Sequence, residues 1–124
     1  MFEIAVKAEF SSAHNLREYL GKCESLHGHN WKIEVKLNSE KLDKIGMVMD
    51  FTKLKEITKD IISDLDHKYL NEIAYFKKIN PTSENIAKFI YGKIGKRNKN
   101  IAAVSVWEND TSCATYRNVI ARAR

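Results

Sequence analysis

Apolar and polar residues alternate along two early stretches of the chain. Apolar side chains stand at the even positions from Phe2 to Phe10, and charged side chains occupy most of the odd ones. The same alternation runs from His29 to Leu37, with apolar residues now at odd positions. Because successive side chains of a strand point to opposite faces, both stretches are predicted to be strands with one buried face. Residues 15–26, with mixed charge and a glycine, are predicted to form the loop between them.

A period of three to four residues replaces this alternation in the middle of the chain. Asp50 is a suitable N-cap for a first helix, and Thr82 or Ser83 suits a second helix that closes near Gly95. The apolar stripe of the first helix consists of Phe51, Leu54, Ile57, Ile61 and Leu65. The stripe of the second helix consists of Ile86, Phe89, Ile90 and Ile94. Residues at this spacing share one side of a helix, so each helix is predicted to bury its stripe.

Two more strands are predicted after the second helix. Residues 101–107 alternate again and end at Glu108, and a turn separates them from a weaker alternation over Cys113–Ala123. The order of elements predicts an α+β fold, a four-stranded antiparallel sheet with two helices on one face. The other face and the outer strands would stay open in a single copy. Association of copies edge to edge into a closed barrel would cover them, so we expect a homo-oligomer.

Composition limits the class of protein. With 124 residues, 44% of them hydrophobic and 30% charged, the chain is expected to form one globular domain over residues 1–124. No apolar run approaches the roughly 20 residues that span a bilayer, and the first residues lack the pattern of a signal peptide. Two cysteines at unlike positions do not suggest a disulfide framework. We therefore expect a cytoplasmic protein without a membrane partner.

The net charge of +5 leaves three interpretations of the basic residues open. A solvated basic surface is the simplest one, because lysines and arginines are scattered along the chain. The charge can also attract a polyanionic small substrate such as a polyphosphate. Binding to nucleic acid is the third interpretation, but the densest basic cluster, residues 93–99, contains no aromatic residue. We therefore expect no nucleic-acid partner.

Three of the four histidines fall close together in the sequence, near one of the two cysteines. His27 and His29 stand two apart around Gly28, so at the start of a strand both imidazoles would point to one face. His14 follows the first strand and can add a third nitrogen. Three neutral imidazoles suit Zn²⁺ and leave a fourth position for water or substrate, as in catalytic zinc sites. The spacing therefore predicts a Zn²⁺ site.

Simpler interpretations of these residues stay open. Exposed or capping histidines are common, and two histidines two residues apart are by themselves a weak signal. Cys23 is a small buried hydrophobe in the simpler interpretation. Beside a cation, however, the pKa of its thiol would fall, and the thiolate can accept a proton.

Asp66, His67 and Glu108 form a second group of candidates at the ends of predicted elements. Neighbouring residues of a helix do not face each other, so Asp66 contacts His67 only if the backbone bends there. In the functional interpretation the carboxylate orients the imidazole, which exchanges protons with Cys23 or with substrate. Glu108 can hold a planar guanidine-like edge with two parallel hydrogen bonds. In the simpler interpretation both carboxylates are surface groups, and His67 is a cation favoured at a helix C-terminus.

Taken together, these motifs resemble the 6-pyruvoyl-tetrahydropterin synthase family, and among its branches most closely the 6-carboxy-5,6,7,8-tetrahydropterin synthases. The match runs in order over nearly the whole chain. It rests on Ala13-His14, Cys23-x-x-x-His27-Gly28-His29, Val48-Met49-Asp50-Phe51, Leu65-Asp66-His67-x-x-Leu70-Asn71, Pro81-Thr82-Ser83-Glu84-Asn85 and Glu108. The resemblance implies the tunnelling fold, in which trimers close a barrel and two trimers stack into a hexamer with active sites at subunit interfaces.

The resemblance also implies roles for single residues. The residues that match the zinc ligands of the family are His14, His27 and His29. Cys23 matches the catalytic base, and His67 matches the proton-relay histidine, with Asp66 as its companion. Glu108 matches the glutamate that anchors the pterin ring and is also assigned to the relay. The positions expected to line the pterin pocket with it are Thr82 and Glu84.

The substrate of the family is 7,8-dihydroneopterin triphosphate. The carboxy branch converts it to 6-carboxy-5,6,7,8-tetrahydropterin, acetaldehyde and triphosphate, on the way to 7-deazaguanine nucleosides such as queuosine and archaeosine. The gap between Cys23 and His27 is shorter than in animal pyruvoyl synthases, which favours the carboxy branch. We therefore expect a zinc-dependent lyase. The alternatives are 6-pyruvoyl-tetrahydropterin synthesis and a catalytically silent oligomeric module that binds pterins or nucleotides.

Glu24, directly after Cys23, bears on the product. A related branch that trims the side chain of the substrate for folate synthesis uses a glutamate near this position. Sequences with Cys-Glu-x-x-His-Gly-His resemble members proposed to carry out both reactions. In that interpretation Glu24 contacts the substrate, and 6-hydroxymethyl-dihydropterin is a second product. As an ordinary loop carboxylate Glu24 would have no such role, and both interpretations stay open.

Overall fold

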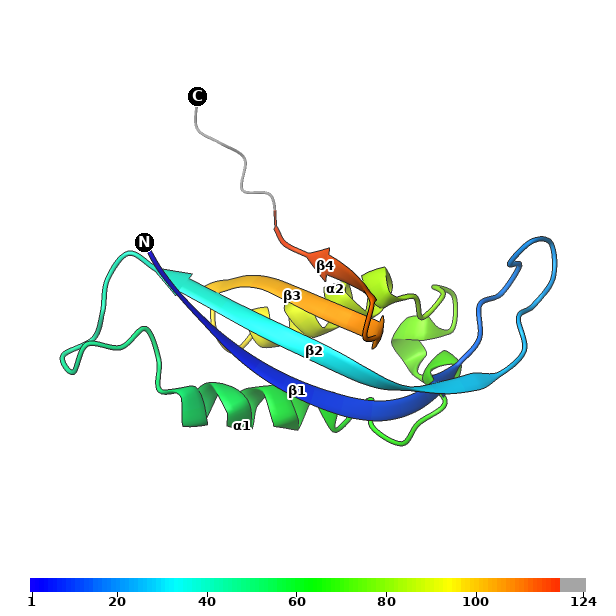
Figure 1. Ribbon diagram of the computed structural model, residues 1–124, viewed down its shortest axis with the longest axis horizontal. Helices are drawn as coiled ribbons and strands as arrows, with labels where there is room; N and C mark the ends of the chain where they lie inside the picture. The colour runs from blue at the N-terminus through cyan, green and yellow to red at the C-terminus, as the bar shows by residue number, and fades with distance from the viewer. Residues whose placement is uncertain (119–124) are drawn as a thin grey trace, which may run out of the picture.

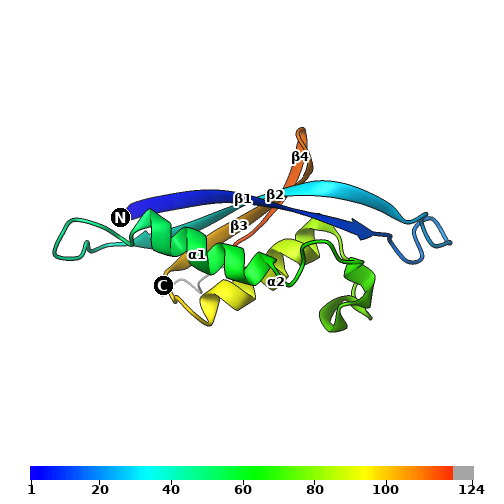
Figure 2. The ribbon, with the colours of Figure 1, turned by 90° about the horizontal axis from the view of Figure 1, so that it is seen from below.

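The computed structural model describes residues 1–118 of the chain. Four strands form one antiparallel sheet, namely β1 (Phe2–His14), β2 (His27–Ser39), β3 (Ile101–Asn109) and β4 (Ser112–Tyr116), in that spatial order. The helices are α1 (Phe51–Ile62) and α2 (Ser83–Gly95), joined by the short 3-10 helices η1 (Leu70–Glu72) and η2 (Ala74–Phe76). Figure 1 and Figure 2 show both long helices on the same face of the sheet. This arrangement confirms the predicted α+β class and the predicted order of elements.

Strands β1 and β2 are longer than the alternation predicts. Their ladder runs from Phe2 opposite Ser39 to His14 opposite His27 without a shift of register. The polar residues after Phe10 continue β1 because their backbone groups still pair with β2, and paired backbone groups are what a strand requires. Figure 1 shows both strands as long and curved, with the predicted loop connecting them at one end.

The inner side chains of β2 form the centre of the core. They are Trp31, Ile33, Val35 and Leu37, none of which exposes more than 1% of its surface. Leu54 of α1 and Ile86 and Ile90 of α2 are fully buried and belong to the same cluster. Burial of one such side chain contributes about 1.5–3 kcal/mol. The core therefore lies between the sheet and the helix layer.

Both helices begin where the sequence predicts. The Asp50 carboxylate accepts a hydrogen bond from the backbone N–H of Thr52 at 2.8 Å. The Thr82 hydroxyl accepts one from the backbone N–H of Asn85 at 3.1 Å, so Thr82 is the cap of α2. Among the described residues, no helix is long and apolar enough to cross a membrane.

The predicted stripe of α1 is wrong at its two ends. Phe51 is 55% exposed, so the first residue of the helix does not belong to its buried stripe. Leu65 is fully buried, but it follows the end of the helix at Ile62. The chain turns after the helix and carries Leu65 into the core from a non-helical segment.

The fourth strand is shorter than predicted. β4 ends at Tyr116, and positions 119–123 of the predicted strand lie outside the described residues. Arg117 and Asn118 are both exposed, and two polar residues in succession interrupt the two-residue period of a half-buried strand. Tyr116 itself packs edge-on against Tyr91 of α2, with ring centroids 4.9 Å apart.

The outer edge of β1 is covered only near its end. The backbone N–H of His67 donates to the carbonyl of Ser11, and that of Ala13 donates to the carbonyl of Lys68. Within residues 1–118, no backbone group pairs with the outer edge of β1 before Ser11 or with the outer edge of β4. Two edges with free N–H and C=O groups therefore remain, as the prediction of edge-to-edge association requires.

Removal of the N-cap of α1 is expected to weaken the fold measurably. We expect Asp50→Ala to lower the free energy of unfolding by about 1 kcal/mol, because the amide of Thr52 loses its acceptor. Urea denaturation at fixed protein concentration measures the change. Glu56→Ala, on the exposed side of α1, is the control and should change the free energy by less than about 0.5 kcal/mol. Equal losses in the two variants would contradict the capping role.

Candidate metal centre and active site

The end of the β1–β2 ladder brings three histidines together. His14 stands directly opposite His27, and His29 lies two residues further along β2 on the same face. The centroids of the three rings lie 4.7, 4.8 and 5.2 Å apart, and every pair meets edge to face. His14 is 1% exposed, whereas the other two rings remain partly accessible to solvent.

Backbone carbonyls determine which nitrogen of two of these rings points inward. The Nδ1 atoms of His14 and His27 lie 2.8 Å from the carbonyl oxygens of Pro81 and Ser25, respectively. A carbonyl accepts but cannot donate, so each Nδ1 carries the proton and each Nε2 keeps its lone pair. The two Nε2 atoms face each other at 3.1 Å. Two lone pairs at that distance repel each other unless a cation lies beside them.

The third imidazole completes the set. Nε2 of His29 is buried and has no hydrogen-bond partner in the described part of the chain. It belongs to a group of three ligand nitrogens that all lie within 4.8 Å of one another. A buried nitrogen without a partner costs free energy, and one metal ion would satisfy all three nitrogens. The donor set suits Zn²⁺ and leaves one coordination position open, so these residues fit the metal that the sequence predicts.

Glu108 and Trp31 frame the cluster. Oε2 of Glu108, near the end of β3, lies 3.6 Å from Nε2 of His14 and 3.9 Å from Nε2 of His29. The fully buried indole of Trp31 packs edge-on against both imidazoles and donates a hydrogen bond to the carbonyl of Ser12 at 3.1 Å. One side of the cluster is therefore held by the core, and the other carries a carboxylate.

A hollow of about 400 Å³ opens beside Glu108. Its lining consists of Leu16, Thr82, Ser83, Glu84, Glu108, Ser112, Cys113 and Ala114. The structure thus brings Thr82 and Glu84 to the same hollow as Glu108. Cys113 is a lining residue that sequence reasoning missed. Its position early in the predicted fourth strand, opposite the end of the third, was the available signal.

Cys23 lies in the loop after β1, with its side chain exposed. The neighbouring Glu24 contacts the start of the loop, where its Oε1 accepts a hydrogen bond from the backbone N–H of Leu16 at 3.1 Å. The same oxygen lies 3.9 Å from Nδ1 of His27. These contacts place the segment that carries Cys23 beside the histidine cluster.

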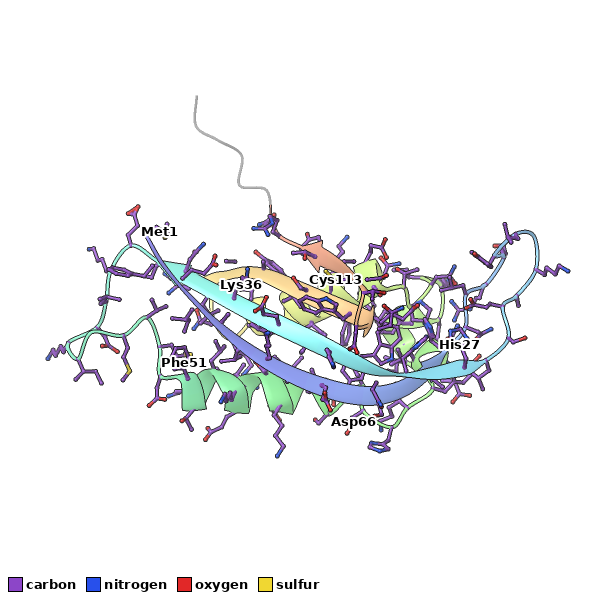
Figure 3. All side chains as sticks on the ribbon, viewed as in Figure 1. Met1, His27, Lys36, Phe51, Asp66 and Cys113 are labelled. Atoms are coloured by element: carbon purple, nitrogen blue, oxygen red, sulfur yellow. The ribbon has the colours of Figure 1, made fainter. Side chains whose placement is uncertain are left out.

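Asp66 and His67 lie apart from the cluster. Their side chains contact each other at 3.0 Å, because the backbone bends at His67, where φ is +55°. The backbone N–H of Ser11 donates to Asp66, which holds the pKa of that carboxyl below its ordinary value. Figure 3 shows Asp66 beyond β1, away from the label of His27. His67 is 82% exposed, and it does not belong to the group of three histidines that could share a metal ion in the described chain.

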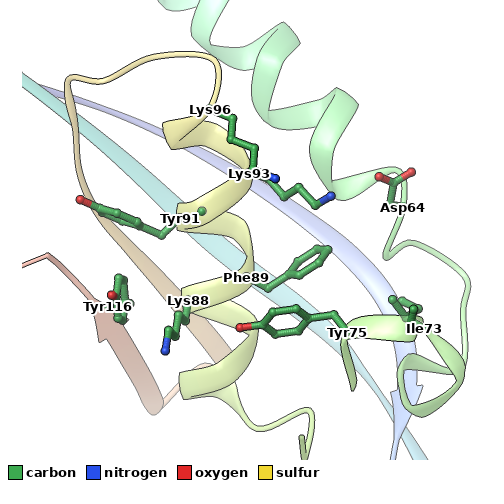
Figure 4. Close-up of a pocket in the computed structure, with 11 residues that line it drawn as sticks. Asp64, Ile73, Tyr75, Lys88, Phe89, Tyr91, Lys93, Lys96 and Tyr116 are labelled. Carbon is green, nitrogen blue, oxygen red and sulfur yellow. The ribbon is translucent and has the colours of Figure 1, made fainter. Parts of the chain in front are cut away.

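Another hollow, of about 790 Å³, lies along the outer side of α2, as Figure 4 shows. Phe89 and Tyr91 of α2 and Tyr75 of η2 contribute to its walls, and three lysines surround it. None of its lining residues belongs to the histidine cluster. The volume of a hollow therefore does not by itself identify the active site. The candidate site lies at the three histidines and the smaller hollow beside Glu108.

Comparison with known proteins agrees with this geometry. Residues 3–119 match the family described as 6-pyruvoyl tetrahydropterin synthase. The chain belongs to this family. The resemblance seen in the motifs is therefore confirmed, and the protein is a lyase-type enzyme of pterin metabolism with tetrahydropterin synthase-type activity.

Relatives in this family are named after different reactions. A putative 6-carboxy-5,6,7,8-tetrahydropterin synthase of Archaeoglobus fulgidus is 39% identical over 92% of this chain and 94% of the relative. Dihydroneopterin monophosphate aldolase of Pyrococcus furiosus is 37% identical over 86% of this chain and 90% of the relative. The solved structure of Caenorhabditis elegans 6-pyruvoyl tetrahydropterin synthase is 27% identical, with a TM-score of 0.83 over 95% of this chain and 96% of that one.

The metal-free protein is expected to lose stability in mild acid. Burial lowers the pKa of His14 below its ordinary value of 6.5, so the native state holds this imidazole neutral where the unfolded chain protonates it. The unfolded state then binds more protons, and stability falls as the pH drops through about 6.5 and below. Urea denaturation in the presence of a chelator measures this dependence. His14→Gln should weaken it, and an unchanged dependence in that variant would contradict the assignment.

Proposed function

We propose that the protein is a zinc-dependent lyase that converts 7,8-dihydroneopterin triphosphate and one water molecule to 6-carboxy-5,6,7,8-tetrahydropterin, acetaldehyde and triphosphate. The observation that carries the proposal is the convergence of three imidazole nitrogens beside the carboxylate of Glu108. A relative named as a putative synthase of this kind, 39% identical, supports the branch. The product would feed the biosynthesis of 7-deazaguanine nucleosides such as queuosine and archaeosine.

The metal centre would act on the side chain of the substrate. His14, His27 and His29 would hold Zn²⁺, which as a Lewis acid makes hydroxyl groups of a bound substrate more acidic. The carbonyls of Pro81 and Ser25 keep two of the imidazoles in the tautomer that such binding needs. Trp31 excludes water from the inner side of the cluster.

The hollow beside Glu108 would hold the pterin ring. A pterin carries adjacent N–H groups on one edge, and a carboxylate can accept two parallel hydrogen bonds from such an edge. Glu108 lies between the metal centre and this hollow, so a ring anchored there places its side chain toward the histidines. Thr82 and Glu84 line the hollow and would contact the ring.

The proton transfers need residues from two copies of the chain. Cys23 would remove a proton from a side-chain carbon of the substrate, since its loop lies beside the cluster. The Asp66–His67 pair is exposed at the edge of β1 and does not belong to the histidine cluster of its own copy. We infer that it completes the site of a neighbouring copy in a homo-oligomer, with a hexamer of two stacked trimers as the expected assembly. Free edges on β1 and β4 support such association.

A second reaction is favoured by one contact. Oε1 of Glu24 lies 3.9 Å from Nδ1 of His27, so a second carboxylate stands on the outer side of one proposed metal ligand. The Pyrococcus furiosus relative is named as an aldolase, which cleaves a carbon–carbon bond. A dual enzyme would release 6-hydroxymethyl-dihydropterin in addition to the carboxy product. Formation of 6-pyruvoyl-tetrahydropterin is the remaining alternative within the family.

Loss of the thiol is expected to abolish turnover without loss of the metal. Cys23→Ala should bind about one Zn²⁺ per chain, like the wild type, because none of the three imidazoles is changed. The rate of triphosphate release should fall by at least about 100-fold, because the base is missing. Elemental analysis and a phosphate assay measure the two quantities. A fully active Cys23→Ala protein would reject the role of this residue, and loss of zinc would make it a ligand instead.

The products distinguish the possible reactions. Mass spectrometry of the wild-type reaction with dihydroneopterin triphosphate should show 6-carboxytetrahydropterin. Glu24→Gln keeps an acceptor oxygen for Leu16 but removes the charge, so it should suppress 6-hydroxymethyl-dihydropterin alone if the enzyme is dual. Identical products from both proteins would leave Glu24 without a role in product choice. Binding of the substrate without any altered pterin would reject the lyase and indicate a silent pterin-binding module.

A further inference from the structure

The loop that carries Cys23, residues 15–26, is held at its root by side-chain amides from a distant segment. The backbone N–H of Asn15 donates to Oδ1 of Asn71 at 3.0 Å, and Nδ2 of Asn71 donates to the carbonyl of Asn15 at 2.8 Å. This reciprocal pair is the pattern by which two backbones pair in an antiparallel ladder. Asn71 is 7% exposed, so both bonds are shielded from water.

Asn80 repeats this arrangement two residues further along the loop. The backbone N–H of Arg17 donates to Oδ1 of Asn80 at 2.9 Å, and Nδ2 of Asn80 donates to the carbonyl of Arg17 at 3.1 Å. Alternate residues of an extended chain present their backbone groups to the same side. The two amides therefore pair with the chain that follows β1 in the way that the backbone of a neighbouring strand would.

The returning part of the loop pairs with the other side of this extension. The backbone N–H of Glu24 donates to the carbonyl of Leu16 at 2.8 Å, and Nδ2 of Asn15 donates to the carbonyl of Glu24 at 3.1 Å. The Glu24 carboxylate accepts from the N–H of Leu16 at 3.1 Å. Cys23 precedes Glu24, which makes these hydrogen bonds, so the position of Cys23 depends on where Asn15 and Leu16 are held.

The tip of the loop is a local turn, in which the backbone N–H of Gly21 donates to the carbonyl of Glu18 and that of Lys22 donates to the carbonyl of Tyr19, so these bonds stay within the loop. Glu18 and Leu20 adopt φ of 58° and 53°, a conformation that residues other than glycine adopt at an energetic cost. The segment that supplies the amides is itself tied to the loop, because the guanidinium of Arg17 donates to the carbonyls of Asn71 and Phe76. The root contacts therefore determine the position of the whole loop.

We propose that Asn71 and Asn80 are positioning residues that hold Cys23 beside the metal centre by pairing with the backbone of Asn15 and Arg17. The catalytic consequence rests on the proposed function, in which Cys23 is the base. The same segment also supplies the carbonyl of Pro81, which orients His14. One stretch of chain would thus position both the base and a metal ligand, and neither asparagine lines the hollow beside Glu108.

The test compares Asn80→Asp with the same change at Asn38, a half-buried asparagine of β2. Asn80→Asp keeps the acceptor for Arg17 but replaces the donor with an oxygen that repels the carbonyl. We expect amide hydrogen exchange at Leu16 and Glu24 to accelerate by at least about tenfold, because the paired extension of β1 loosens. Exchange at Val35 and Val104, in the sheet centre, should stay unchanged. Asn71→Asp is the second variant, and it should act in the same direction.

Kinetics separate positioning from general damage. In Asn80→Asp we expect kcat to fall by about tenfold or more, with KM within about twofold of the wild type and about one Zn²⁺ per chain retained. In Asn38→Asp all three quantities should match the wild type. Unchanged exchange at Leu16 and Glu24, or faster exchange with an unchanged kcat, would overturn the proposal. Zinc loss, or faster exchange in the sheet centre, would overturn it as well, because the asparagine would then serve stability.

A result that rejects the proposed reaction can be distinguished from one that rejects the positioning role of the asparagines. A wild-type protein that leaves dihydroneopterin triphosphate unchanged overturns the function and, with it, the catalytic consequence for Cys23. The exchange rates at Leu16 and Glu24 then decide by themselves whether the two amides hold the loop.

Discussion

The register of the β1–β2 ladder is the constraint on which the site depends. Side chains alternate between the faces of a strand, so a slip of one residue would turn His14 and His27 to opposite faces. The buried row on β2 that begins at Trp31 opposes such a slip, because the same movement would bring apolar side chains into water. Burial in the core therefore fixes the distance between imidazoles at the end of the ladder, and Trp31 belongs to both regions.

The chemistry of the centre follows from neutral groups more than from charges. Two backbone carbonyls set the tautomers of His14 and His27, and burial keeps His14 neutral. Neutral imidazoles are what a divalent metal ion requires as ligands. Glu108 is an accessible charged group next to them, with 36% of its side chain exposed, so it can meet a substrate that enters from solvent. The centre thus has a rigid inner side and an accessible outer side.

One copy of the chain holds only part of the proposed machinery. The metal ligands, the pterin hollow and the loop with Cys23 converge at one end of the sheet, whereas Asp66 and His67 stand at the outer edge of β1. A sheet with two free edges can place the edge of one copy beside the site of the next. The same open edges therefore account for both the expected assembly and the separation of the proposed proton-relay pair from the histidines.

The sequence by itself determined the order of the strands and the two long helices and indicated the histidines of the candidate metal site, because most of these signals are short-range patterns. Alternation marks the strands, Asp50 and Thr82 mark the helix starts, and two histidines two residues apart share a face of any strand. Only the tertiary structure decided where β1 ends, that Phe51 is exposed, and that Asn71 pairs with Asn15. These features depend on partners far away in the sequence, which no local pattern reveals. The bend that joins Asp66 to His67 is of the same kind, since it exists only where the chain after α1 meets β1.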